Sequence, residues 1–273
     1  MGLMFMTDLD GTLLGHDDFS FASIRDDILA LLRSGVTMVP NSSKTSREIS
    51  AFCDELGASL PFICENGAAL VNRRLFDLPA APDSPDVVGL APDRLMALWD
   101  RHIEASLKRH CHFLADLGQA EQAWHLGLRG AALKQAMARD YSAPFVFTGP
   151  DPEFSDLQQQ AGNAGLAIKR GGRVCNLSAG HDKSGFTGAL RAEYQAAGTE
   201  LVIVGFGDGE NDIGMLETSD IACIVPRPGQ PPLTLASPPP TVITARRTAP
   251  EGWLEAARQA LSILECERGD QHG

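Results

Sequence analysis

The sequence predicts an α/β fold, a doubly wound parallel sheet that carries an inserted α+β domain. Short apolar runs alternate with amphipathic helical stretches at both ends of the chain, and this alternation stops between about residues 83 and 180. The chain has 273 residues, which is long enough for one large core and a smaller second domain. We therefore expect a core domain of residues 1–82 and 181–273 and an inserted domain of residues 83–180.

The predicted elements follow in chain order. Helices are expected to begin at Ser23 and Ser43, each between two buried strands. The inserted block contains apolar helical spacing over residues 95–107 and several short apolar runs typical of strands. A helix over residues 183–197 returns the chain to the alternating pattern. The predicted strands are residues 3–6, 36–39, 61–64, 201–204, 221–225 and 242–244, and a helix over residues 250–264 closes the chain.

Composition excludes several classes of partner. The formal net charge of −12 disfavours nucleic acid and anionic membranes, and no apolar run reaches the roughly 18 residues of a membrane span. The six cysteines are scattered without a CxxC pair, which favours reduced thiols in a cytoplasmic protein. We expect a small-molecule partner, and a monomer or a homodimer. An acidic protein needs a metal or local donors to hold an anionic substrate.

The first chemical motif is Asp8-Leu9-Asp10-Gly11-Thr12, directly after an apolar strand. Ligands of open α/β sheets bind at the carboxyl ends of strands. One carboxylate can bind a metal and attack phosphorus, while the second can protonate a leaving oxygen. An Asx turn at the end of the strand is the alternative interpretation.

The second motif also follows a strand. Three glycines alternate with carboxylates over residues 205–212, and Asp208 and Asp212 lie within it. Mg²⁺ prefers carboxylate, water and phosphate oxygens, so Asp8 and Asp208 at two strand ends suit it. A glycine-rich Ca²⁺ loop or a plain turn is the alternative, although the spacing lacks the EF-hand pattern.

Two further segments complete the set. The hydroxyls of Ser42, Ser43 and Thr45 lie at an expected helix start, where an anion can bind or where one of them can simply cap the helix. Lys183 follows a Gly-His-Asp turn, where a lysine is usually a solvated surface charge. The sequence shows no ligand spacing for His110, His112, His125 and His181, which are interpreted as structural or surface residues.

These four segments, taken in order, resemble the haloacid dehalogenase superfamily. The resemblance covers the whole chain and implies a HAD-like Rossmannoid core with a type IIB α+β cap. It implies Asp8 as nucleophile and Mg²⁺ ligand, Asp10 as general acid and base whose carbonyl also binds the metal, and Ser42 and Lys183 as phosphoryl-binding groups. It further implies that Asp208 binds Mg²⁺.

The same resemblance gives roles to two neighbours of Asp208. Asp212 would support the metal ligands from behind, and Asn211 would bond near the phosphate. With Mg²⁺ as the cofactor, the implied activity is that of a phosphoric monoester hydrolase. A non-enzymatic phosphoryl-binding protein on the same fold is the remote alternative.

A closer similarity is to mannosyl-3-phosphoglycerate phosphatases. It lies in the Pro-Phe-Ile-Cys-Glu-Asn-Gly stretch at residues 61–67 and in two segments of the inserted block, residues 140–145 and 169–173. Ala143 and Val174 depart from that family, where Glu and an aromatic residue are frequent. The implied substrate is mannosyl-3-phosphoglycerate, or else another sugar or polyol phosphate such as glucosyl-3-phosphoglycerate or a hexose phosphate.

A phosphoglycerate ester carries a carboxylate as well as a phosphate, and arginine forks bind carboxylates in a bidentate way. Arg170 and Arg173 in the inserted block are therefore candidate substrate ligands, although most such arginines are merely solvated. The remaining candidate substrate ligands of this kind lie in the core, where the superfamily commonly has Gly-Arg and this sequence has Ser43, Lys44 and Thr45.

Overall fold

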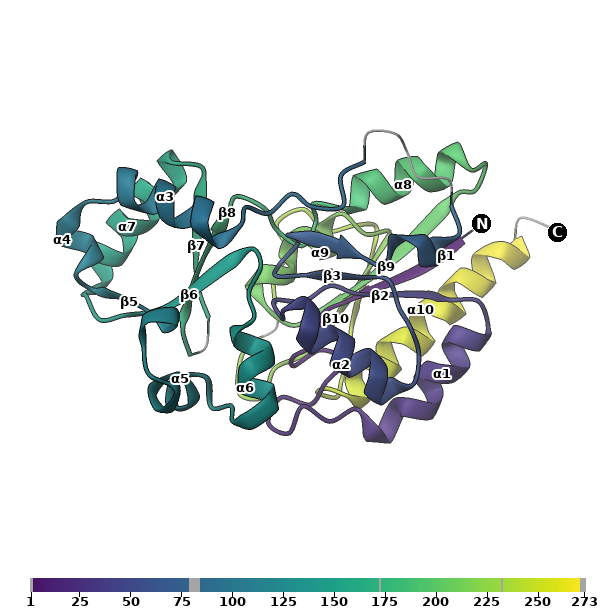
Figure 1. The fold of residues 1–273 in the computed structure, drawn as a ribbon. Coiled ribbons are helices and arrows are strands. Elements are labelled where there is room, and N and C mark those ends of the chain that lie inside the picture. Colours follow the sequence, from purple (N-terminus) through teal and green to yellow (C-terminus); the bar gives the residue numbers. More distant parts are fainter. Residues whose placement is uncertain (1, 79–83, 172, 232, 271–273) are drawn as a thin grey trace.

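Five parallel strands form a core sheet in the order β11-β10-β9-β1-β2, which confirms the predicted fold class (Figure 1). The computed structural model describes residues 2–78, 84–171, 173–231 and 233–270. The predicted boundary at residues 82 and 83 lies outside the described residues, so the exact domain limits stay a prediction. The core strands are β1 (Gly2–Thr7), β2 (Thr37–Pro40), β9 (Leu201–Gly207), β10 (Ile221–Ile224) and β11 (Thr241–Thr244).

The strands are buried on both faces because alternate side chains enter two different hydrophobic clusters. On β1, Phe5 packs into a cluster with α1 and α10, whereas Met4 and Met6 pack against residues of α8 and α9. This double burial explains why the strands read as continuous apolar runs. The helices around the sheet are α1 (Arg25–Arg33), α2 (Ser46–Leu56), α8 (Thr187–Ala196), α9 (Ile213–Glu217) and α10 (Glu251–Asp270).

Short elements complete the core. The antiparallel pair β3 (Phe62–Cys64) and β4 (Ala69–Val71) joins the sheet through the Ser42 amide, which donates to the Ile63 carbonyl. The 3-10 turns of the core are η1 (Ala22–Ile24), η2 (Arg73–Phe76) and η4 (Glu210–Asp212), whereas η3 (Leu114–Asp116) lies beside β6 of the inserted domain. Within the described residues, no helix is both apolar enough and long enough to cross a bilayer.

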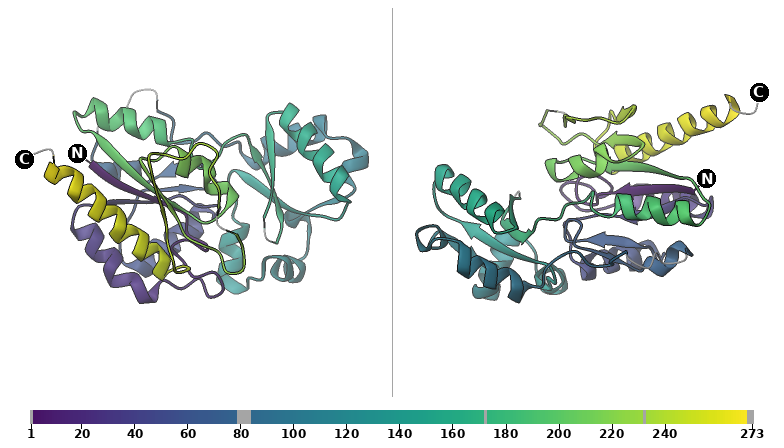
Figure 2. Two further views of the ribbon diagram at one scale, coloured as in Figure 1. Left: turned by 180° about the vertical axis from the view of Figure 1, so that it is seen from behind. Right: turned by 90° about the horizontal axis from the view of Figure 1, so that it is seen from above.

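A second, antiparallel sheet in the order β5-β6-β8-β7 lies beside the core, and we call it the cap sheet (Figure 2). Its strands are β5 (Cys111–Phe113), β6 (Ser142–Phe147), β7 (Leu166–Arg170) and β8 (Cys175–Ala179). Helices α3 (Pro92–His102), α4 (Ala105–Lys108) and α7 (Asp151–Asn163) lie on the side of this sheet away from the core (Figure 1). Two helices lie apart from them, α5 (Gln119–Leu126) and α6 (Gly130–Met137).

The helix boundaries differ from prediction where local backbone groups find other partners. The helix expected over residues 95–107 is broken into α3 and α4, because Ile103 is extended and the Glu104 amide donates to Gln160 Oε1. The helix expected at Ser23 begins at Arg25 instead, and the Ser23 hydroxyl donates to Glu251 Oε1 across the fold. Tertiary hydrogen bonds thus override the local capping pattern.

Glu65 joins the core to the first residues of the cap sheet. Its side chain is fully buried, and its carboxylate accepts hydrogen bonds from the amides of Asp140 and Tyr141 at 2.8 and 3.1 Å and from the Ser142 hydroxyl. Its backbone is left-handed at φ 48°, and Gly67 follows at φ 96°, where an added Cβ would lie 1.8 Å from the Asp182 carbonyl oxygen. This turn therefore requires glycine and brings the chain against the segment that leaves the cap sheet.

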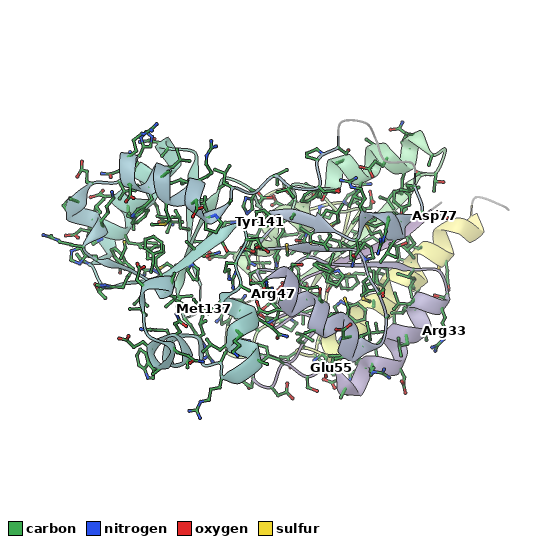
Figure 3. All side chains as sticks on the ribbon, viewed as in Figure 1. Arg33, Arg47, Glu55, Asp77, Met137 and Tyr141 are labelled. Carbon is green, nitrogen blue, oxygen red and sulfur yellow. The ribbon has the colours of Figure 1, made fainter. Side chains whose placement is uncertain are left out.

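The Glu65 contact predicts a large effect of a nearly isosteric change. Glu65→Gln would place an amide group against an N–H donor and leave a buried polar group unpaired, at a cost of about 1–3 kcal/mol in unfolding free energy. Urea denaturation followed by circular dichroism measures this. The matched control is Glu55→Gln on the exposed side of α2 (Figure 3), which should change stability by less than about 0.5 kcal/mol. Equal stabilities of the two variants would contradict the proposed role of Glu65 in joining the core to the cap sheet.

Candidate active site

Carboxylates from two neighbouring strands meet at the carboxyl edge of the core sheet. Asp8 follows β1 and Asp208 follows β9, and the Asp8 amide donates to the Phe206 carbonyl at 3.0 Å. Oxygens of Asp8, Asp208 and Asp212 lie within 4.8 Å of one another, and all three side chains are buried. The two aspartate motifs, two hundred residues apart in sequence, therefore form one site.

Lys183 links two of these carboxylates. Its fully buried Nζ donates to Asp8 Oδ1 and to Asp212 Oδ1, both at 2.6 Å. Burial acts to lower the pKa of Lys183, but the Asp212 and Asp8 carboxylates outweigh it, so the pKa lies above its usual value. The surface-charge alternative for Lys183 is therefore wrong, because the ammonium is held charged inside the site.

The Asp8 carboxylate responds to burial in the opposite sense. Burial raises the pKa of Asp8 to about 8, with further increases from Asp212 and Asp208, while Lys183 acts to lower it. Burial also raises the pKa of Asp208, although Arg227 acts to lower it. Both carboxylates thus hold a proton more readily than a surface aspartate until a further cation enters the cluster.

Asp212 is fully engaged by its neighbours. Its Oδ1 accepts from Lys183, and its Oδ2 accepts from the backbone amides of Asp208 and Gly209 at 2.9 Å each. These bonds fix the loop that carries Asp208 and orient the Lys183 ammonium. Such contacts suit a supporting role rather than direct metal binding.

Asp208 has two partners that the sequence analysis did not single out. Thr12 Oγ1 donates to its Oδ1 at 2.9 Å, and Arg227 Nε donates to its Oδ2 at 2.5 Å. Thr12 belongs to the first motif, and Arg227 follows β10 at the same edge of the sheet. Arg227 could have been identified from the sequence by its position just after β10, another strand of the parallel sheet.

Gly11 allows this close approach. Its φ is 80°, and an added Cβ would lie 2.6 Å from Asp208 Oδ2. Any side chain here would collide with the carboxylate and strain the backbone. The glycine between Asp10 and Thr12 is therefore required by the two-strand geometry of the site.

Asp10 lies at the open side of the cluster. Its side chain is 36% exposed, and Lys44 Nζ lies 2.9 Å from its Oδ1. Lys44 also lies 3.9 Å from Glu48 and 5.3 Å from the centre of the Phe19 ring. The structure thus brings Lys44 to the site, but its ammonium pairs with Asp10.

The hydroxyl segment divides into two parts. Ser42 is buried at the end of β2, where its Oγ accepts from the Lys44 amide at 3.3 Å. Thr45 Oγ1 accepts from the Glu48 amide and donates to the Gln135 carbonyl at 2.9 Å, so it caps α2 and links it to α6. The prediction that Thr45 binds substrate is therefore corrected, because both functions of its hydroxyl serve the fold.

The substrate roles of two other candidates in the core, Ser43 and Asn211, stay predictions. The Ser43 carbonyl accepts from Arg139 Nη1 at 2.9 Å, which places Ser43 beside the segment leading to β6. Asn211 Nδ2 lies 3.4 Å from Asn66 Oδ1, next to the Glu65 turn. Both residues lie in the loops that surround the aspartate cluster.

The predicted arginines of the cap lie elsewhere. Arg170 pairs with Asp151 at 3.0 Å, and its guanidinium lies 4.1 Å from the centre of the Phe154 ring, on the helix-covered side of the cap sheet. Arg173 donates to the Leu126 carbonyl at 2.7 Å. The assignment of Arg170 as a substrate ligand is corrected, because side chains alternate along β7 and position 170 points away from the core. A substrate role for Arg173, which lies beyond the end of β7, stays a prediction.

The donor set fits a hard divalent cation. Among the described residues, one group of carboxylates is arranged closely enough to hold a metal ion, and it offers Asp8 and Asp208 oxygens at the carboxyl edge of the core sheet. Mg²⁺ takes one or two carboxylates together with waters and substrate phosphate oxygens. The residues therefore fit the predicted cofactor.

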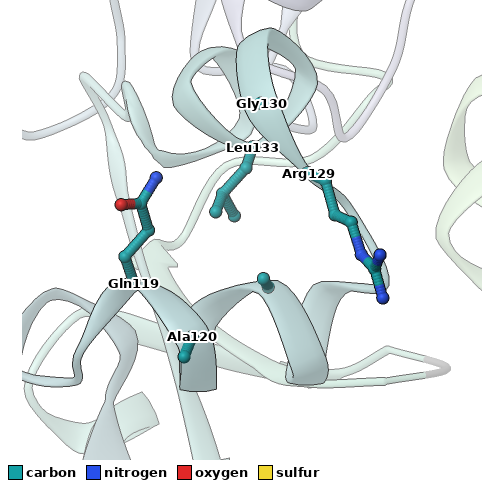
Figure 4. A pocket seen from close by; sticks show the side chains of 6 residues that line it. Gln119, Ala120, Arg129, Gly130 and Leu133 are labelled. Carbon is teal, nitrogen blue, oxygen red and sulfur yellow. The ribbon is translucent and has the colours of Figure 1, made fainter.

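A shallow hollow of about 300 Å³ lies between α5 and α6 (Figure 4). Arg129 is the one charged residue that lines it, and no carboxylate or nucleophile accompanies it. This hollow therefore lacks the groups for hydrolytic chemistry, which the aspartate cluster provides. Its lining residues are Gln119, Ala120, Ala123, Arg129, Gly130 and Leu133.

Similarity to known proteins agrees with this geometry. Residues 5–76 match the family of haloacid dehalogenase-like hydrolases. The chain is 28% identical over 98% of its length to a glucosyl-3-phosphoglycerate/mannosyl-3-phosphoglycerate phosphatase of Persephonella marina, of which it covers 99%. A protein of the same name from Methanococcoides burtonii is 27% identical over 82% of this chain and 85% of its own length.

Solved structures share the fold at lower identity. A phosphatase of the haloalkanoate superfamily from Bacteroides thetaiotaomicron has a TM-score of 0.63 at 17% identity, with 96% of each chain covered. The sucrose-phosphatase of Synechocystis has a TM-score of 0.52 at 15% identity, with 95% of this chain and 98% of that chain covered. The match of residues 5–76, the relatives and the aspartate site point the same way: the chain is similar to haloacid dehalogenase-like hydrolases, and it is a phosphoric monoester hydrolase.

Proposed function

We propose that the chain hydrolyses mannosyl-3-phosphoglycerate to mannosylglycerate and phosphate. The observation that carries the proposal is the contact of Asp8 with Lys183 beside Asp208, at the edge where two parallel strands end. As a phosphoric monoester hydrolase, the enzyme has a candidate nucleophile at Asp8. The relatives from Persephonella marina and Methanococcoides burtonii, whose names include this substrate, support the choice of ester.

The proposed reaction has two steps. In the first, an Asp8 oxygen forms a bond to phosphorus as the bond to the glycerate oxygen breaks, and Asp10 donates its proton to that oxygen. In the second, Asp10 takes a proton from water, whose oxygen attacks the phosphorus of the aspartyl phosphate and releases phosphate and Asp8. The position of Asp10 at the open side of the cluster suits both transfers.

The remaining groups position the nucleophile and neutralise the charge on the phosphoryl group. Lys183 stabilises the ionised nucleophile and the charge that gathers on the phosphoryl oxygens, and Asp212 holds the ammonium in place. Ser42 and the nearby amides would bind phosphoryl oxygens. Asp8, the Asp10 carbonyl and Asp208 would hold Mg²⁺, which supplies positive charge against the phosphate when bound.

Another sugar phosphate remains the second candidate. The names of the relatives include a glucosyl as well as a mannosyl ester, and the core site accounts for the phosphate rather than the sugar. Glucosyl-3-phosphoglycerate shares the carboxylate with the mannosyl ester, whereas a hexose phosphate lacks it. These three esters therefore separate the alternatives by chemistry.

A substrate panel tests the proposal. Initial rates of phosphate release should give a kcat/KM for mannosyl-3-phosphoglycerate that exceeds that for mannose 6-phosphate by about tenfold to a thousandfold, as expected when a charged group of the substrate finds a partner. Glucosyl-3-phosphoglycerate is the control for the sugar. Equal values for the mannosyl ester and the hexose phosphate would leave a general sugar phosphatase and overturn the assigned substrate.

The nucleophile is tested by Asp8→Asn. The amide keeps the shape of the side chain but cannot attack phosphorus, so kcat should fall by about three orders of magnitude or more. The matched control is Asp17→Asn on the exposed surface of the same segment, which should keep wild-type turnover. Turnover of Asp8→Asn above about a tenth of wild type would show that another group attacks.

The metal site predicts a defined pH dependence. Chelator should abolish activity, and Ca²⁺ should compete, because it prefers more oxygens at longer distances. Since burial raises the pKa of Asp8 to about 8, a proton competes with the metal below that pH. Mg²⁺ affinity should therefore rise from about pH 6 to about pH 8 and level off above, by at most about tenfold per unit for one proton.

Isothermal titration calorimetry of the metal-free protein at several pH values measures this affinity. Repeating the titration in buffers of different ionisation enthalpy counts the protons released. Asp8→Asn should remove most of the pH dependence while Asp208 still binds. Activity that persists in chelator, or an affinity that does not change with pH, would refute the metal assignment.

A further inference from the structure

The two faces of the cap sheet have different surroundings. Phe145, Ile168 and Leu177 point into the hydrophobic cluster under α3, α4 and α7. The alternation of side chains along each strand places Lys169 on β7 and Asn176 on β8 on the opposite face, which is turned toward the core (Figure 1). Lys169 and Asn176 are direct partners in the register of β7 and β8.

Lys169 lies within electrostatic reach of the aspartate site. Burial lowers its pKa, the Asp182 carboxylate acts to raise it, and the charges of Lys183 and Asp212 also act on it. His181 in turn responds to the charge of Lys169. These electrostatic effects agree with the position of Lys169 on the face of the cap sheet that is turned toward the core.

The other cations at this edge already have carboxylate partners. Lys183 pairs with Asp8 and Asp212, Arg227 pairs with Asp208, and Lys44 pairs with Asp10. Lys169 forms no ion pair within the described residues. A half-buried ammonium without a partner is costly, and an anion arriving from solvent would offset that cost.

Two buried acceptors accompany this cation. Within the part of the chain that the structure describes, Asn176 Oδ1 and His181 Nδ1 are buried and have no hydrogen-bond partner. His181 Nε2 donates to the Glu65 carbonyl at 3.1 Å, so Nδ1 is the acceptor of a neutral ring. Buried acceptors of this kind normally receive a hydrogen bond, and sugar or glycerate hydroxyls are suitable donors.

We propose that Lys169, Asn176 and His181 form the subsite that reads the organic part of the substrate, with the Lys169 ammonium binding its carboxylate. The acceptors Asn176 Oδ1 and His181 Nδ1 then take hydrogen bonds from adjacent hydroxyls. This inference rests on the proposed function, because it assigns the carboxylate of a phosphoglycerate ester. It replaces Arg170, which lies one position along β7 and points to the opposite face.

The test compares adjacent residues on one strand. Lys169→Met removes the ammonium, and Arg170→Met removes a cation of the same strand that pairs with Asp151 on the far face. The quantity measured is the ratio of kcat/KM for mannosyl-3-phosphoglycerate to kcat/KM for mannose 6-phosphate. Lys169→Met should lower this ratio by about tenfold to a hundredfold, mainly through KM for the carboxylate ester.

The controls separate recognition from folding. Arg170→Met should leave the ratio and the turnover of both esters unchanged, and Lys169→Arg should keep most of the preference because it retains the charge. Asn176→Asp offers an independent variant, since a carboxylate opposite Lys169 would compete with that of the substrate and lower the same ratio. Circular dichroism and gel filtration confirm that each variant is folded.

The outcomes distinguish this inference from the proposed function. A wild-type preference for the phosphoglycerate ester that survives Lys169→Met and Asn176→Asp would overturn the subsite and leave the substrate assignment intact. Equal losses for both esters would also overturn it, because Lys169 would then act on the core chemistry or the fold. Absence of any preference in the wild type would overturn both proposals.

Discussion

The buried ammonium of Lys183, held between Asp8 and Asp212, is the interaction on which the site depends. Three carboxylates within 4.8 Å of one another repel when all are ionised, and burial increases the cost of each charge. Lys183 contacts two of them, and Arg227 contacts the third. The acidic cluster is therefore assembled around cations of the chain itself. The raised pKa values of Asp8 and Asp208 indicate that one further cation would stabilise their ionised forms.

The position of Lys183 follows from the route of the chain. Lys183 comes four residues after β8 of the cap sheet and before α8 of the core, so the segment that leaves the cap delivers the ammonium to the nucleophile. Asn41 donates to the Lys183 carbonyl at 2.7 Å, and the Gly67 turn packs against Asp182. Glu65 and His181 join the same turn to the cap sheet. Cap and core thus share the residues that order the site, and a displacement of the cap sheet would act on Lys183 directly.

Most of the core site could be predicted from sequence because the motifs of Asp8, Ser42 and Asp208 follow apolar strands of the parallel sheet. Asp8, Asp208 and Lys183 indeed come together, although their roles in catalysis stay predictions. The cap residues could not be assigned in the same way. Arg170 and Lys169 are neighbours in sequence and equally cationic, and only the pairing of β7 with β8 and the helices on one face decide which of them faces the core. A shift of one residue reverses every side chain of a strand.

The amino-acid sequence by itself determined the fold class and the edge at which the carboxylates gather, because apolar periodicity and strand-end motifs are local properties of the chain. The tertiary structure alone decided which partner each polar group takes. Thr45 is satisfied by Gln135, Asp208 by Thr12 and Arg227, and Glu65 by the start of β6. Most of these partners are far apart in sequence and share no local pattern. Their pairing arises when the packed sheets remove water and leave each buried donor and acceptor only the neighbours that the fold supplies.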